Sequence, residues 1–209
     1  MHWIRGAGTG NFLRKHLLKY SVFADIGRPR QWRFLLAENS SPRSKWHLGA
    51  TEKELAFAEF QHALICLAEA FYRHVGKSLA LFAKDSNFTG YDSVILHTIQ
   101  AADRPKSITE LQDFTNRSDV ANIQYSVRKL MKAGLIEKVP RTKGRGTQYR
   151  ITKKGHEVVR AYTEYRRELL EQFPEETKKL IDRLTNAKNL IVILTGLYDQ
   201  ASRLMSTRA

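Results

Sequence analysis

Residues 121–132 carry side chains suited to reading a nucleic acid, spaced so that they share one face of a helix. Asparagine and glutamine amides pair bidentately with adenine, and arginine pairs with guanine or with phosphate. The stretch holds no acid, and the members of this face are Ala121, Asn122, Gln124, Tyr125, Arg128, Lys129 and Lys132. The pattern predicts a helix that enters the major groove of a double helix, with Ser118 just before it as a further contact.

A basic hairpin follows directly. Arg141, Lys143 and Arg145 flank a tip in which Gly144 and Gly146 permit the backbone angles of a tight turn. An arginine at such a tip can enter a narrow minor groove, where the negative potential is enhanced. A merely solvated amphipathic helix would not be expected beside such a hairpin, so the two features together favour duplex binding. The glycines alone do not indicate a nucleotide site, because no strand precedes them in a Rossmann arrangement.

Two short helices must hold this face in place. Ser107 and Glu110 have capping-box spacing and begin the first helix. Ser118 or Asp119 caps the second helix, which ends before Gly134 at a helix C-cap position. The inward side of the second helix should pack against the first through Val120, Ile123, Val127 and Leu130.

Strands are expected over 135–140 and 147–152, and a further helix follows Thr152. Upstream, a helix of about eight turns begins at Thr51, because Thr51 and Glu54 have capping-box spacing and apolar residues then recur at steps of three and four. Another helix is expected over 91–102. The fold class is therefore mostly α, with a small β-hairpin wing.

The C-terminal part predicts a second long helix that begins at Pro174, where Glu175 and Glu176 suit the first turn. Such a helix needs a partner surface, either within the chain or on a second copy, because its apolar residues form a heptad seam. The seam comprises Leu180, Leu184, Ala187, Ile191, Leu194, Tyr198, Ala201 and Met205.

The stretch ITELQDFTNRSDVANIQYSVRKLMKAGLIEK, followed by a hairpin and ITKKG, resembles the winged helix-turn-helix of the MarR family of dimeric bacterial transcription regulators. The order of elements matches over roughly residues 53–205, and the specific residues over about 107–155. The end of the family's recognition helix and its post-wing motif are matched by Leu130, Gly134, Leu135, Ile151, Thr152 and Gly155.

The resemblance implies dimerisation through the terminal helices, and two recognition helices about one turn of DNA apart on a pseudo-palindrome. It also implies base contacts by Asn122, Gln124 and Tyr125, and a wing contact by Arg145. Lys143 departs from the family, which usually has at this position an acid that orients the wing arginine.

Composition points in the same direction. The formal charge of +14 and the pI near 10.0 favour a polyanionic partner, namely DNA, RNA or an anionic membrane surface. Residues 1–50 carry nine lysines and arginines against two acids, and we expect them to form a partly ordered accessory extension. One cysteine, Cys66, suggests a reducing compartment. No apolar run reaches the roughly 18 residues of a membrane span, and no export signal is evident, so we expect a cytoplasmic protein that associates with the nucleoid when bound to DNA.

Other chemistry finds little support. His62 and Cys66 lie four residues apart with Glu69 nearby, but a buried small cysteine beside a histidine is the favoured interpretation over a metal or redox site. No nucleophile motif, phosphate-binding loop or paired carboxylates indicate an enzyme, and no metal or cofactor is expected. By resemblance, Phe71, Tyr91 and His97 are candidate lining residues for a small aromatic or acidic effector, although plain core is preferred for each.

The sequence thus predicts a homodimeric regulator that binds specific double-stranded DNA and is released by a small effector. The expected parts are a basic extension (1–50), a dimerisation helix (51–86), a winged helix-turn-helix (87–156) and C-terminal dimerisation helices (157–209). The alternative is an RNA-binding or ribosome-associated basic winged-helix protein, favoured by the charge of the extension. A winged-helix adaptor that binds only protein would carry a less basic hairpin.

Overall fold

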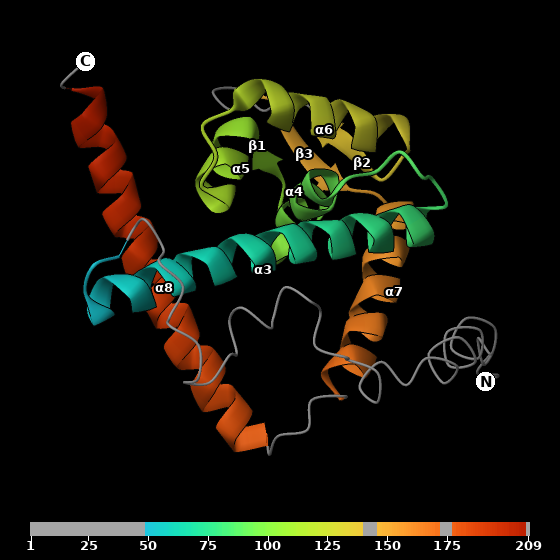
Figure 1. Ribbon diagram of the computed structural model, residues 1–209. Helices are drawn as coiled ribbons and strands as arrows, with labels where there is room; N and C mark the ends of the chain where they lie inside the picture. Colours follow the sequence, from blue (N-terminus) through green and yellow to red (C-terminus); the bar gives the residue numbers. More distant parts are fainter. Residues whose placement is uncertain (1–48, 140–145, 172–176, 208–209) are drawn as a thin grey trace. The chain divides into compact units, whose positions relative to one another are not determined.

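The computed structural model describes residues 49–139, 146–171 and 177–207, so the predicted extension lies outside the described residues apart from Gly49 and Ala50. The chain divides into two compact units, Met1–Arg166 and Arg167–Ala209, which are considered separately. The elements are α3 (Glu52–Ala83), α4 (Gly90–Gln100), a 3-10 turn η1 (Ala101–Asp103), β1 (Lys106–Ser107), α5 (Ile108–Thr115), α6 (Val120–Lys132), β2 (Ile136–Val139), β3 (Gln148–Ile151), α7 (Lys153–Leu170) and α8 (Thr177–Ser206) (Figure 1).

Capping boxes begin three of these helices. Those predicted at Thr51 and Ser107 are confirmed, and Thr89 with Asp92 forms a third at the start of α4. Of the two candidate caps for α6, Asp119 is the one that accepts a hydrogen bond from the helix. Helix α3 ends at Ala83, a little earlier than predicted, because Lys84 takes a left-handed conformation with φ 56°.

The sheet has three antiparallel strands in the order β1–β3–β2. The predicted hairpin is present, with Ile136 opposite Ile151 and Val139 opposite Gln148. The third strand, β1, was not predicted because it is only two residues long and carries no alternating pattern. It joins the sheet through Lys106, which lies opposite Tyr149.

The core of the first unit lies between α4, α5, α6 and the sheet. Its most deeply buried apolar residues are Ile95, Leu96, Ile99, Leu111, Ile123, Leu130 and Leu135. Three of the four residues predicted on the inward side of α6 are buried, but the prediction for Val120 is wrong, since that residue is 37% exposed. Val120 is the first residue of the helix and is not part of this core.

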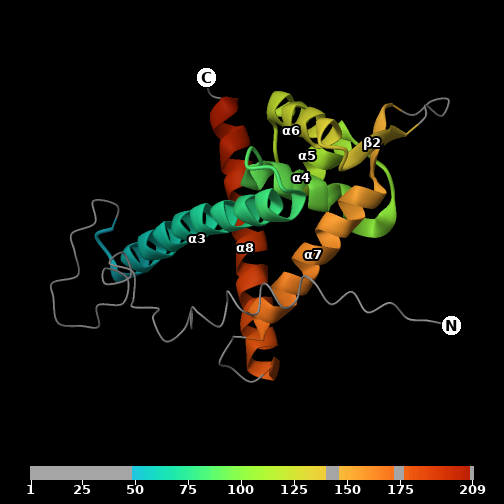
Figure 2. The same ribbon diagram turned by 90° about the vertical axis from the view of Figure 1, so that its right-hand side faces the viewer.

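Two glycines let α3 and α4 approach closely. Gly76 of α3 is buried, and a side chain added to it would lie 2.7 Å from the backbone nitrogen of Gly90. A side chain on Gly90 would in turn overlap the backbone carbonyl of Tyr72. In both views α6 lies on the side of the domain away from α3 (Figures 1 and 2). The packing of α3 therefore leaves the outer face of α6 open.

In the second unit, α8 is a 30-residue helix with no buried residue. Several positions of the predicted seam are open in the single chain, among them Leu184 at 54%, Ile191 at 38% and Met205 at 73% exposure. Pro174, Glu175 and Glu176, where this helix was predicted to begin, lie outside the described residues. None of the helices in the described part combines the length and apolar character that crossing a membrane requires.

Candidate nucleic-acid interface

The outer face of α6 is open to solvent. Six of the predicted contact residues at or before this helix are exposed, namely Ser118, Ala121, Asn122, Gln124, Tyr125 and Arg128. Asp119 accepts hydrogen bonds from the backbone nitrogen of Asn122, at 3.1 Å, and from its side-chain amide. These bonds hold the pKa of the Asp119 carboxyl below its ordinary value. The N-terminus of α6 therefore already holds a carboxylate.

Lys129 is placed differently from the rest of the face. Its Nζ donates to Oδ2 of Asp92 at 2.6 Å, and the Asp92 side chain is only 2% exposed. Burial raises the pKa of this carboxyl, but hydrogen bonds from Lys129, from Thr89 and from the hydroxyl of Ser126 outweigh it and lower the pKa overall. Asp92 also accepts from the backbone nitrogen of Thr89 at 2.7 Å. The ion pair thus joins α6 to the first turn of α4.

A hollow of about 540 Å³ separates α6 from the wing strands. From α6 it is lined by Gln124, Arg128 and Lys132 among others, and from the strands by Lys138 and Tyr149. Lys138 is exposed on β2 and was not predicted as a contact, although its position on the outward side of a short strand could have suggested it. The helix face and the wing strands therefore form one continuous basic surface.

Arg117 is a second residue that the sequence reasoning missed. It lies in the turn before α6, and its guanidinium carbon is 4.2 Å from the centre of the Tyr91 ring. The Tyr91 ring lies 4.6 Å from that of Tyr72 on α3. The guanidinium lies over the Tyr91 ring, which places a cation beside the N-terminal end of the exposed face.

The wing-tip residues Arg141, Lys143 and Arg145 lie outside the described residues, so their contacts stay predictions. The candidate effector residues are not gathered around one described pocket. Phe71 and Tyr91 each lie beside Tyr72, whereas the ring of His97 lies 4.8 Å from that of Tyr162 on α7.

His62 and Cys66 are adjacent on α3, with Sγ 3.6 Å from Nε2. Across the described ranges, no group of three or more histidine, cysteine or acidic side chains is arranged to hold a metal ion.

The region around α6 is similar to a known protein family. Residues 88–155 match the family model described as a winged helix DNA-binding domain. The comparison with curated proteins gave no match. Among solved structures, Rv1404 from Mycobacterium tuberculosis is 22% identical, over 72% of this chain and 97% of its own, with a TM-score of 0.47.

Two further solved structures are similar to this chain. A structure of MarR is 18% identical, over 64% of this chain and 97% of its own, with a TM-score of 0.49. S. aureus MepR, solved as a complex with DNA, is 15% identical, over 66% of this chain and 96% of its own, with a TM-score of 0.47. The match of residues 88–155 confirms the predicted winged helix, and the chain carries a winged helix DNA-binding domain.

Proposed function

We propose that this protein is a transcription regulator that binds a specific double-stranded DNA sequence as a homodimer. Helix α6 enters the major groove, and the wing meets the adjacent minor groove. A regulator of this kind acts in the cytoplasm, at the nucleoid. The matched domain family is one of DNA-binding proteins rather than of enzymes.

The observation that carries this proposal is the joint surface of α6 and the wing strands. Gln124 and Arg128 supply groups that read base edges, while Lys132 and Lys138 supply cations for the backbone. Between Val120 and Leu135 the chain has no acid that would repel phosphate. The ion pair between Asp92 and Lys129 holds α6 against the domain, so the reading side chains project from a fixed support.

The C-terminal helix supports the proposed two-fold symmetry. The apolar seam of α8 is open in the single chain, and a second copy would cover it. A dimer of this kind presents two copies of α6 to a pseudo-palindromic operator, with half-sites one helical turn apart.

A small effector would release the DNA by favouring a spacing of the two α6 helices that does not fit the operator. The MepR structure solved with DNA supports a DNA partner for this fold, and effector release rests on the resemblance to the family.

Selection of bound sequences from a random duplex pool tests the proposal. We expect an inverted repeat with half-sites one turn apart, because a two-fold dimer reads the same bases twice. Structured RNA should compete weakly. Equal competition by RNA, or recovery of no consensus, would overturn the DNA-specific function in favour of RNA binding.

The selected duplex then tests the face of α6. Arg128→Ala should weaken binding by about 1–3 kcal/mol if the guanidinium contacts a base. Arg160→Ala is the matched control, because Arg160 is also an exposed helical arginine but belongs to α7. Gln124→Ala should alter the preferred sequence more than the salt dependence. Equal losses for Arg128→Ala and Arg160→Ala would show that α6 is not the reading helix.

A further inference from the structure

A second pocket, of about 250 Å³, lies where the end of α4 meets strand β3 and the start of α7. Its polar lining includes Gln100, Asp103, Arg104 and Arg150. No residue that lines it also lines the hollow beside α6. It is therefore a separate site, and what it binds does not depend on the DNA-binding function.

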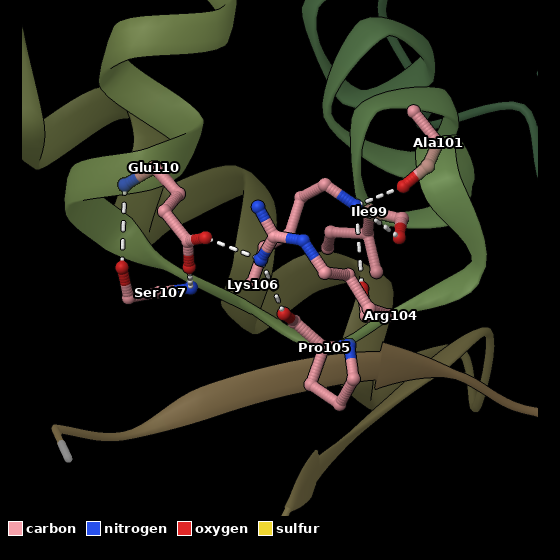
Figure 3. Close-up of polar contacts among 7 residues, drawn as sticks. All are labelled: Ile99, Ala101, Arg104, Pro105, Lys106, Ser107 and Glu110. Carbon is pink, nitrogen blue, oxygen red and sulfur yellow. Dashed lines mark hydrogen bonds and ion pairs between the residues drawn. The ribbon is translucent and has the colours of Figure 1, made fainter.

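The wall that carries Asp103 and Arg104 is held by a buried lysine. Lys106 is fully buried, and its Nζ donates to the carbonyl oxygens of Ile99 and Arg104, both at 3.2 Å, and to that of Ala101. Figure 3 shows this ammonium group among the three carbonyls. Burial lowers the pKa of Lys106, and the neighbouring charge of Arg104 lowers it further. With all three of its protons bonded, Lys106 fixes a turn in which Ala102 and Asp103 both have positive φ.

One acceptor of a lining residue has no donor in the part of the chain that the structure describes. The Oε1 atom of Gln100 is buried and, among the described residues, accepts no hydrogen bond. Buried acceptors are nearly always satisfied in folded proteins, so this atom points to a donor from a bound molecule. Asp103, three residues further on, adds a negative charge to the same lining. An ammonium group suits this pair because it is both cationic and a triple donor.

The other side of the pocket offers cations. The Arg104 guanidinium donates to the carbonyl of Pro105 and to the carboxylate of Glu110, and Nε of Arg150 donates to Glu137 at 2.7 Å. A guanidinium has five N–H donors, so both arginines keep donors for a further anion. A carboxylate is the anion that matches this geometry most directly.

We propose that this pocket binds a free aliphatic α-amino acid. The carboxylate would bind Arg104 and Arg150, the ammonium would bind Gln100 and Asp103, and the side chain would lie against Ile99 and Ile151. A monocarboxylate would leave the Gln100 oxygen without a donor, and a simple amine would leave the remaining N–H donors of the two arginines without an acceptor. The recognition is therefore of a zwitterion.

Calorimetric titration of the full-length protein tests the ligand class. The probes are L-valine, L-leucine, L-isoleucine and L-methionine, followed by 4-methylpentanoate and 3-methylbutylamine, which lack the ammonium or the carboxylate of leucine. We expect at least one amino acid to bind, and both leucine analogues to bind at least ten-fold more weakly than leucine does. Failure of all four amino acids, or equal binding of either analogue, overturns the proposal.

Variants of the lining residues then test whether the amino acid binds in this pocket. Gln100→Leu should abolish binding without lowering the melting temperature, because the replaced oxygen accepts no hydrogen bond from any of the described residues. A large fall in melting temperature would instead show that Gln100 has a structural role and that the pocket is misassigned. Arg150→Gln should weaken binding at least ten-fold, whereas Arg160→Gln, at an exposed arginine outside the pocket, should not. Because binding is measured without DNA, a failure here leaves the DNA-binding proposal intact.

Discussion

The carboxylate of Asp92 connects two elements of the domain through its hydrogen bonds. It caps the first turn of α4 through Thr89, and it accepts from Lys129 of α6 at 2.6 Å. Lys129 also lies 5.5 Å from the centre of the buried Phe88 ring, which further restricts its ammonium group. A lysine held in this way orients the helix, whereas Lys132, three residues further on, is exposed.

Lys129 and Lys132 should therefore respond differently to the same substitution. Lys132→Met should lower DNA affinity and reduce the slope of log K against log salt by about one, as expected for one lost phosphate contact. Lys129→Met should leave that slope unchanged but destabilise the fold by about 3 kcal/mol, because it strands the buried Asp92 carboxylate. Chemical denaturation and salt-dependent binding measure the two effects. A reduced salt slope for Lys129→Met would place its ammonium on the DNA instead.

At the scale of elements, the close contact of α3 and α4 depends on glycine. Gly90→Ala should destabilise the first unit by about 2–4 kcal/mol, because the added methyl group overlaps the Tyr72 carbonyl and forces the helices apart. Gly196→Ala is the control, since nothing in the described chain lies near that position of α8 and alanine favours a helix by about 1 kcal/mol. Thermal unfolding checks both, and equal effects would argue against the close approach.

A group of rings joins α3, α4 and α7. His97 of α4 lies 4.8 Å from Tyr162 of α7, and His74 of α3 lies 5.7 Å from Tyr165. Burial lowers the pKa of both histidines, and the charge of Arg166 lowers that of His97 further. The folded protein therefore holds both rings in the neutral form at neutral pH.

Stability should consequently fall as the solution is acidified. The unfolded chain binds a proton at each histidine near pH 6.5, before the folded chain does. The contribution of the two histidines to the free energy of unfolding is therefore complete above about pH 6.5. It declines as the pH falls toward the lowered pKa of the folded state. Urea denaturation between pH 5 and 7 should show this dependence of stability on pH. The slope should be smaller in His97→Gln, and unchanged in His156→Gln because His156 is exposed. An unchanged slope in His97→Gln would exclude His97 as its source.

At the scale of the whole molecule, the open apolar seam of α8 is what a second copy of the chain would cover. Ile191→Glu should convert the dimer to a monomer in sedimentation experiments and sharply weaken binding to a two-fold operator, because a charge would be buried at the interface. Asn189→Glu is the matched control, since Asn189 is equally part of α8 but lies off the seam. Dissociation by both variants, or by neither, would reject the seam as the interface.

Much of the domain could be predicted from local patterns. Capping boxes at Thr51 and Ser107, the glycine after α6 and the periodicity of α6 itself are short-range signals, because each depends on residues within one or two helical turns. The winged helix followed from the order of those elements. Strand β1 could not be predicted, since two residues have no periodicity of their own and pair only because the hairpin is already present.

The sequence by itself determined that a helix with a basic and amide face stands before a hairpin, because side-chain type and helical spacing are properties of the chain alone. Only the tertiary structure decided which basic side chains of the domain are held by a partner. Lys129 is held by a carboxylate 37 positions away, Arg117 is stacked on an aromatic ring of α4, and Lys106 is buried among backbone carbonyls. The partners of Lys129 and Arg117 lie far from them along the chain and meet them only when the core brings the helices together, whereas the carbonyls around Lys106 lie within seven residues of it.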